Sequence, residues 1–187
     1  MKKIAIIGGA IIVLGIFFFI YTRWINNIMN DRALTLQLSP ALLKQLGGKQ
    51  IYDFPYKPAP IQWDGKYLQV DHGNIFEEIN PSLNFVYNKK RNEKLNTDRF
   101  FPGNDIKGIV WLIINANEVG RYIGGGGAFQ NYYVLNFLDL ASETILARDT
   151  IWGGMPPETI SASSSGGVGK LPKEEEVIKT IRLRTEN

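Results

Sequence analysis

The hydrophobic pattern of the chain begins with one uninterrupted apolar run, residues 4–21, which contains no charged residue. A helix of this length is about 27 Å long at about 1.5 Å per residue, close to the roughly 30 Å hydrocarbon core of a bilayer. In lipid, a helix satisfies all of its own backbone hydrogen-bonding groups. The pattern therefore predicts a single transmembrane helix that contacts the lipid bilayer through residues 4–21.

The flanks of this run predict its orientation and its outer boundary. Lys2 and Lys3 precede the run, so positive charge is denser on its amino side. Because Lys and Arg are enriched on the cytoplasmic side, the amino terminus is expected in the cytoplasm and the remaining chain outside it, in the periplasm or extracellular space. Tyr21 and Trp24 are expected at the outer membrane interface, where amphipathic rings prefer to lie. The helix is expected to continue to residue 30 as an amphipathic collar.

Two further interpretations of the run are open. A cleaved secretory signal would export the same domain, but no small-residue cleavage pattern follows the run, which favours a retained anchor. Ala5 and Gly9 form a small-x-x-x-small pair, a weak indication that two spans associate.

Two short helices are predicted beyond the membrane segment. Ser39 can cap a helix over residues 40–46, with Pro40 at its first position and its leucines on one side. Near the carboxyl terminus, residues 173–184 place three glutamates in a first turn and basic residues near the end, which complements a helix dipole. A strand is the alternative for this second segment.

The remaining pattern is typical of β structure. Asp64 and Gly65, between the apolar-rich residues 61–63 and 66–70, predict a β-hairpin. Further strands are expected at residues 83–87, 108–114, 118–123, 131–140 and 143–152. Residues 115–117 are expected to form a turn, and the last four strands an antiparallel meander. Residues 88–99 and 153–172 are expected to be loops.

These elements predict an α+β protein of two parts. Residues 1–30 form the transmembrane anchor with its collar, and residues 31–187 form an exported domain built on a mainly antiparallel sheet. A chain of this length beyond the membrane has the size of one domain with its own core.

Charge and composition exclude several functional classes. The net charge of +3 comes from Lys2, Lys3 and Arg23, and the remaining chain holds 18 basic and 18 acidic residues. This balance argues against a nucleic-acid partner, which needs a basic face. The chain has no cysteine and a single histidine, which excludes thiolate chemistry and sites built from several imidazoles.

The candidate chemistry is sparse. Asp71 and His72 are the only adjacent acid and imidazole, and Asp139 and Asp149 are two carboxylates on neighbouring predicted strands. The glycines of residues 166–170 resemble part of a phosphate loop, but the first glycine and the hydroxyl after the lysine are missing. No pattern predicts a catalytic residue, a metal ligand or a cofactor.

A basic cluster with two adjacent aromatic residues is the one surface feature that suggests a contact. It comprises Lys89, Lys90, Arg91, Lys94, Arg99, Phe100 and Phe101. Such a cluster beside a bilayer could contact anionic headgroups, whereas a solvated loop is the plainer interpretation.

The sequence thus predicts a membrane-anchored envelope protein whose exported domain binds a protein partner or assists assembly. Two alternatives stay open. One is a tethered hydrolase that uses carboxylates or the pair Asp71 and His72. The other is a β domain that binds a small ligand.

Overall fold

The computed structural model describes residues 18–19, 21–22, 25–26, 29–31, 33–46, 48–73, 85–159 and 166–186. The chain divides into two units, Met1–Gln37 and Leu38–Asn187. In the first unit the described residues up to 35 are helical, and Tyr21 is exposed.

The predicted membrane span falls mostly outside the described residues, as do Ala5, Gly9 and Trp24. Across the described parts of the chain, no helix is both long and apolar enough to cross a bilayer. The span and its orientation therefore stay predictions.

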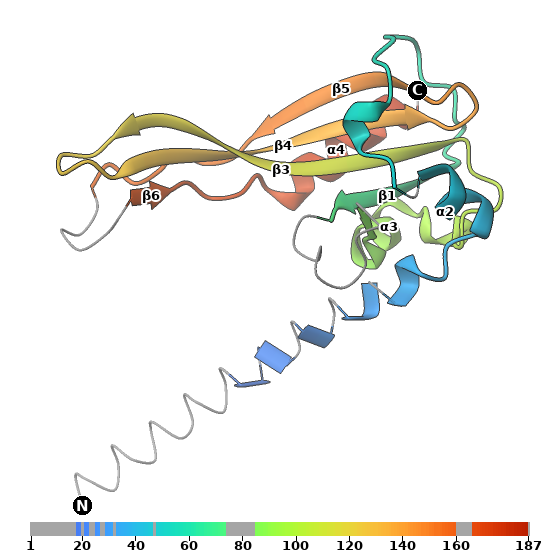
Figure 1. Ribbon diagram of the computed structural model, residues 1–187, viewed down its shortest axis with the longest axis horizontal. Coiled ribbons are helices and arrows are strands. Elements are labelled where there is room, and N and C mark those ends of the chain that lie inside the picture. The colour runs from blue at the N-terminus through green and yellow to red at the C-terminus, as the bar shows by residue number, and fades with distance from the viewer. Residues whose placement is uncertain are drawn as a thin grey trace, which may run out of the picture. The chain divides into compact units, whose positions relative to one another are not determined.

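The second unit is an α+β fold around a mixed sheet of six strands (Figure 1). The strands are β1 (Tyr67–His72), β2 (Phe85–Tyr87), β3 (Gly108–Arg121), β4 (Gly127–Asp139), β5 (Thr144–Trp152) and β6 (Gly166–Val168). The order is β2-β1-β3-β4-β5, and β6 pairs with β4. The pairs β1–β2, β3–β4 and β4–β5 are antiparallel, whereas β1–β3 and β4–β6 are parallel. The α+β class is confirmed, and the sheet is more mixed than the sequence predicts. Asp64 and Gly65 form a turn, but residues 61–63 are not a strand, so the prediction of a hairpin there is wrong.

The second unit contains helices both before and after the first strands of the sheet. They are α2 (Pro40–Leu46), η1 (Ile51–Asp53), α3 (Lys89–Leu95), η2 (Asp98–Phe100) and α4 (Glu174–Thr185). The predictions of α2 and of the carboxyl-terminal helix α4 are confirmed. The loop prediction for residues 88–99 is wrong, because Asn88 caps α3 by accepting a hydrogen bond from the Arg91 amide, and Asn96 ends it in the left-handed conformation.

The main core lies between α4 and one face of the sheet. Val177 and Ile181 of α4 are fully buried in the same cluster as Val110, Leu112 and Leu135. Alternate residues of a strand point to opposite faces, so Trp111 points to the other side, where the Phe85 ring meets it edge-on. Both faces of the central strands are therefore buried, which explains their continuous apolar runs.

The β3–β4 hairpin is longer than the sequence predicts. Residues 115–117 continue β3 and pair with residues 130–132 of β4, so the prediction of a turn there is wrong. Past Leu112, β3 extends beyond β1 and both of its faces approach solvent, so polar residues fit the strand. Figure 1 shows the hairpin leaving the rest of the sheet, with β6 beside it. We call residues 114–132 together with β6 the arm.

The predicted loop at residues 153–172 contains β6, which the sequence analysis missed. Gly169 donates its amide hydrogen to the Phe129 carbonyl, and Gly154 donates to the Lys170 carbonyl. A Cβ atom at Gly169 would overlap the Gly154 carbonyl oxygen, and one at Gly153 would overlap the Lys170 oxygen. Because these glycines have no Cβ atom, they allow two backbone segments to pack closely. This close packing explains the glycine pattern that resembles part of a phosphate loop.

A partly buried carboxylate fixes the connection between β4 and β5. Asp139 accepts hydrogen bonds from Trp63 Nε1 at 3.2 Å and from the Ser142 amide and hydroxyl at 2.9 and 2.7 Å. Burial acts to raise the pKa of Asp139, but the hydrogen bonds from Ser142 and Trp63 outweigh it and hold the pKa below its usual range.

Asp139→Asn is expected to lower the free energy of unfolding by about 1 kcal/mol at pH 7, since the carboxylate is only partly buried. The depressed pKa stabilises the fold above the unfolded value of about 3.9, and this contribution disappears as pH falls through the folded value. Urea unfolding should therefore show a larger difference at pH 7 than at pH 3. Asp105→Asn, which removes an exposed ion pair with Lys66, is the control and should change stability by less than about 0.5 kcal/mol. A difference for Asp139→Asn that is equal at both pH values would contradict this account.

Candidate functional site

A buried ion network joins the sheet to α3 and α4. The Arg91 side chain is only 8% exposed. Its Nε and Nη2 atoms donate to the two Glu174 carboxylate oxygens, both at 3.1 Å, and its Nη1 donates to Asp71 Oδ1. Asp71 also accepts from Gln69 Nε2 and Asn88 Nδ2, each at 2.7 Å. The network therefore uses the hydrogen-bonding capacity of Asp71 for structure.

The charge of Arg91 is stabilised by its two acidic partners. Burial acts to lower the pKa of the guanidinium, but attraction to Asp71 and Glu174 outweighs it and raises the pKa. Arg91 is thus a permanent cation that pairs with two carboxylates at once.

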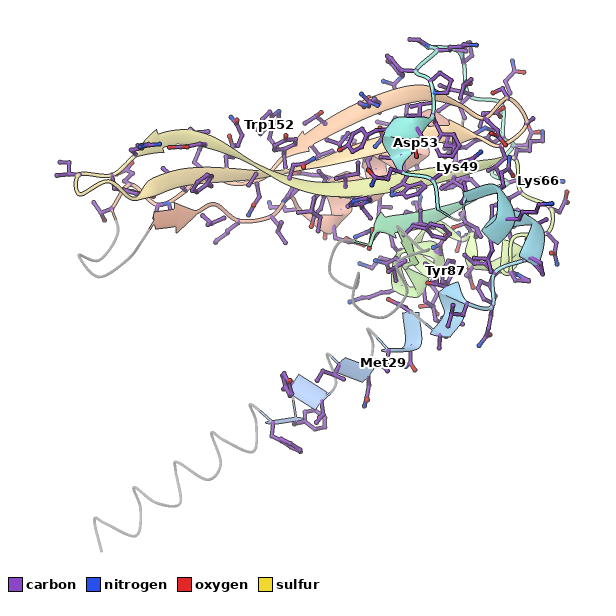
Figure 2. The ribbon with its side chains drawn as sticks, viewed as in Figure 1. Met29, Lys49, Asp53, Lys66, Tyr87 and Trp152 are labelled. Atoms are coloured by element: carbon purple, nitrogen blue, oxygen red, sulfur yellow. The ribbon has the colours of Figure 1, made fainter. Side chains whose placement is uncertain are left out.

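Arg91 is consequently separated from the rest of the predicted basic cluster. The side chains of Lys89, Lys90, Lys94 and Arg99 are exposed. Phe100 and Phe101 are half-buried, with Phe101 packed 5.0 Å from the Tyr87 ring, centroid to centroid. Figure 2 shows Tyr87 beside α3. Contact of the exposed members with lipid headgroups stays a prediction, but Arg91 is buried and Phe101 already has a partner.

The structure does not bring the predicted acid and imidazole together. Asp71 and His72 are neighbours on β1, so their side chains point to opposite faces of the sheet. Asp71 binds Arg91, whereas the His72 ring lies 6.4 Å from the Trp111 ring. This geometry does not support a cooperating pair.

The two carboxylates on β4 and β5 are also apart. Asp149 pairs with Leu135 in the ladder, four residues along β4 from Asp139, which corresponds to about 13 Å. Glycosidase carboxyl groups lie roughly 5–9.5 Å apart. In addition, Asp149 accepts a bidentate pair of hydrogen bonds from Arg184 at 2.7 and 2.8 Å, so its carboxylate is occupied.

An open cavity of about 660 Å³ lies where β1 begins and where α3 and α4 end. Tyr67, Leu95, Thr97 and Thr185 are the buried residues that line it. The Tyr67 side chain is only 1% exposed, and its hydroxyl has no hydrogen-bond partner among the described residues. Sequence reasoning missed this site because no motif links residues so far apart in the chain.

The charged residues at the rim of this cavity balance one another. They are Asp64, Arg99, Lys107 and Glu186. Lys107 pairs with Asp64, and the Arg99 guanidinium lies 4.9 Å from the centre of the Phe100 ring. Hydrogen bonding to Lys107 and its positive charge lower the pKa of Asp64, so this rim pair stays ionised.

Several large apolar side chains are exposed in the arm or next to it. These are Ile114, Val119, Ile123 and Val168 within the arm and Trp152 and Met155 next to it. Trp152, labelled in Figure 2 where β5 ends, is 50% exposed and packs 4.7 Å from the Tyr132 ring. Large apolar groups gathered on one projection of a soluble domain are typical of an interaction surface.

Comparisons of the chain with known protein families, with characterised proteins and with solved structures gave no match. The fold and the sites described above are therefore interpreted from their own geometry.

Proposed function

We propose that the protein is a membrane-anchored envelope protein whose exported domain binds an extended segment of a partner protein along the arm. The proposal rests on the edge of β3 that faces away from β4. From Ile113 to Arg121 this edge has no strand partner among the described residues, because the pairing with β1 ends at Leu112.

An unpaired edge is a template for another strand. Half of the backbone N–H and C=O groups of a strand point to each side, and those of β3 that point away from β4 are available to a partner. Binding by strand addition takes its affinity from main-chain hydrogen bonds and its specificity from alternate side chains.

The side chains of the arm indicate what kind of segment would bind. Ile114 and Val119 are exposed on β3, and the two charged residues near them, Glu118 and Arg121, pair with each other at 2.8 Å. The edge therefore offers apolar contacts without a net charge. An uncharged segment with apolar residues at alternate positions is its best complement.

In this proposal, the amino-terminal anchor determines where the domain lies in the cell. The apolar run of residues 4–21 holds the protein in the membrane, and the positive charges before it put the domain outside the cytoplasm. A tethered domain searches for its partner only near the membrane, which raises the effective concentration of both.

The test uses the full chain, extracted from membranes in detergent, against a displayed library of linear peptides. Enriched peptides should alternate apolar residues, and they should protect amide hydrogens of residues 113–121 from exchange. Ile114→Lys should weaken their binding by about tenfold or more, because a charge on an edge strand opposes strand addition.

Leu183→Lys is the matched control, since Leu183 is 58% exposed on α4 and Ile114 is 52% exposed on the arm. Equal losses for both variants, or protection confined to α4, would contradict binding at the arm. Recovery of the intact chain in the supernatant without detergent would contradict the anchor.

A further inference from the structure

A row of side chains crosses three strands on the side of the sheet away from α4. Residues directly opposite one another on paired strands point to the same face of a sheet. Asn115 of β3 is opposite Tyr132 of β4, and Tyr132 is opposite Trp152 of β5. Tyr133 belongs to the core cluster on the α4 side, so its neighbour Tyr132 points to the other side. The row of Asn115, Tyr132 and Trp152 therefore lies on the face that α4 does not cover.

Two further rows flank this one. Towards the hairpin turn, Asn117 is opposite Gln130. In the other direction Val134 is opposite both Ile113 and Thr150. Neighbouring rows are two residues apart, so the three rows together span about 13 Å along the strands. We call the side chains of these rows that reach solvent the aromatic–amide face; they are Asn115, Asn117, Gln130, Tyr132, Val134, Thr150 and Trp152.

Aromatic surface lies at the centre of this face. The Tyr132 and Trp152 rings are 4.7 Å apart, centroid to centroid, with 37° between their planes. Trp152 is half-exposed and Tyr132 is partly exposed, so the pair presents apolar ring surface to solvent. Because the two rings pack on each other before any ligand binds, less side-chain freedom is lost on binding.

Uncharged polar groups surround the two rings. The Asn115 and Asn117 amides and the Thr150 hydroxyl can each donate and accept hydrogen bonds. The Gln130 amide donates to the Gly153 carbonyl at 2.9 Å, which holds it next to the end of β5. The face thus complements a ligand that has apolar ring surfaces and many hydroxyl groups.

The charges of this region favour an uncharged ligand. No member of the aromatic–amide face is charged. Arg148 is the charged residue of the adjoining row, where it is opposite Asn136. Its Nε donates to Asn136 Oδ1 at 2.8 Å, and its guanidinium lies 5.4 Å from the centre of the Tyr56 ring, so the fold already uses this cation.

We propose that the aromatic–amide face binds an extended, uncharged glycan built from β-1,4-linked pyranose rings. In such sugars the hydroxyl groups point outward around each ring, and C–H groups cover its two faces. A C–H face stacks on the Tyr132 and Trp152 rings, and the hydroxyls exchange hydrogen bonds with the Asn115 and Asn117 amides. A span of about 13 Å is longer than one sugar ring, so the ligand is an oligosaccharide or a longer chain.

This site is distinct from the one proposed for a partner protein. It uses side chains on a face of the sheet, whereas strand addition uses the backbone edge of β3. Its test therefore does not depend on the proposed partner.

The probes are cellohexaose and chitohexaose, which share this backbone and differ in one acetamido group per ring. Each is titrated into the full chain and followed by saturation-transfer NMR. The detergent has no sugar headgroup, because an alkyl glycoside would compete. We expect saturable binding of at least one hexasaccharide, with the strongest transfer to the C–H protons of its rings. Sorbitol has the hydroxyl groups of a sugar but no ring face, and it should not bind.

Two substitutions of Trp152 separate ring stacking from general apolar contact. Trp152→Leu keeps an apolar side chain without a ring and should weaken hexasaccharide binding by about tenfold. Trp152→Phe keeps a ring and should bind within about threefold of the unchanged protein. Asn117→Ala removes an exposed amide and should weaken binding by about fivefold, the usual effect of losing one hydrogen bond.

Matched controls lie elsewhere on the second unit. Leu183→Ala changes a side chain that is 58% exposed on α4, and Asn104→Ala removes an exposed amide before β3. Neither should change binding. The proposal is wrong if neither hexasaccharide binds saturably, if sorbitol binds equally well, or if Trp152→Leu and Asn117→Ala bind like the unchanged protein. Equal losses for Trp152→Leu and Trp152→Phe would also contradict it, because ring stacking would then not hold the ligand.

Discussion

Replacing Arg91 with methionine is expected to lower the free energy of unfolding by about 3 kcal/mol. Methionine keeps much of the side-chain volume but leaves Asp71 and Glu174 without their shared cation. Removing one member of a buried ion pair typically costs about 3–5 kcal/mol, because the remaining charge is uncompensated. The lower end applies here, since the two carboxylates are 28% and 34% exposed and water screens them in part.

Urea unfolding of the full chain in detergent, followed by tryptophan fluorescence, measures this loss. Lys94→Met is the matched control, because Lys94 is 45% exposed on the same helix and lies 4.0 Å from Glu174. It should cost less than about 0.5 kcal/mol. Replacing Asp71 and Glu174 by their amides in the Arg91→Met background should restore part of the loss. An unchanged midpoint for Arg91→Met would show that the network does not hold α3 and α4 to the sheet.

The network also shows why spacing could not predict the role of Arg91. Its two acidic partners are 20 and 83 residues away in the chain, and nothing in a run of basic residues marks the one that turns inward. The caps of α3 are local, however. Asn88 and Asn96 bracket a seven-residue helix, and an asparagine before the first turn and another after the last are recognisable signals.

The sequence predicted helices correctly where the capping residues and charges agree with the pattern of buried apolar residues. The cap and leucine pattern of α2, and the charges and apolar face of α4, each suffice to define a helix. Predictions failed where surroundings decide the conformation. Asn115 and Asn117 are typical turn residues, yet β4 pairs with this segment throughout and keeps it extended.

The cavity could not be predicted because it is made by the ends of elements. Tyr67 and Thr185 follow apolar patterns on β1 and α4, so each fits a core position in the sequence. Only the packing of α4 on the sheet brings these two residues to the lining of one cavity and buries the Tyr67 hydroxyl without a partner among the described residues.

The attachment of β6 to β4 depends on close backbone contacts, and Gly169→Ala is expected to disrupt it. The new Cβ would overlap the Gly154 carbonyl oxygen, which is backbone and cannot rotate away. The segment would have to move, and the bonds from Gly169 to Phe129 and from Asn131 Nδ2 to the Gly169 carbonyl would be lost. We expect a local loss of about 3 kcal/mol, which corresponds to roughly a hundredfold faster amide exchange in β6 and the adjoining part of β4.

Gly154→Ala is a stringent control, because Gly154 lies beside the same backbone contact, but a Cβ there would meet Lys170 Cβ at 3.5 Å and the Lys170 nitrogen at 3.6 Å, which are both ordinary contacts. Its exchange rates should stay within about threefold of the unchanged protein. Amide exchange in α4 and the central strands should be the same in both variants, because Val177 and Ile181 pack in the core cluster with Val110, Leu112 and Leu135, and neither variant changes a residue of that cluster. If Gly169→Ala leaves the amides of β6 protected from exchange, a glycine at position 169 is not required for the close contact between the two backbone segments. If Gly169→Ala also speeds amide exchange in α4 and the central strands, the arm unfolds together with the rest of the second unit. The arm is then not an independent surface to which a partner strand could be added.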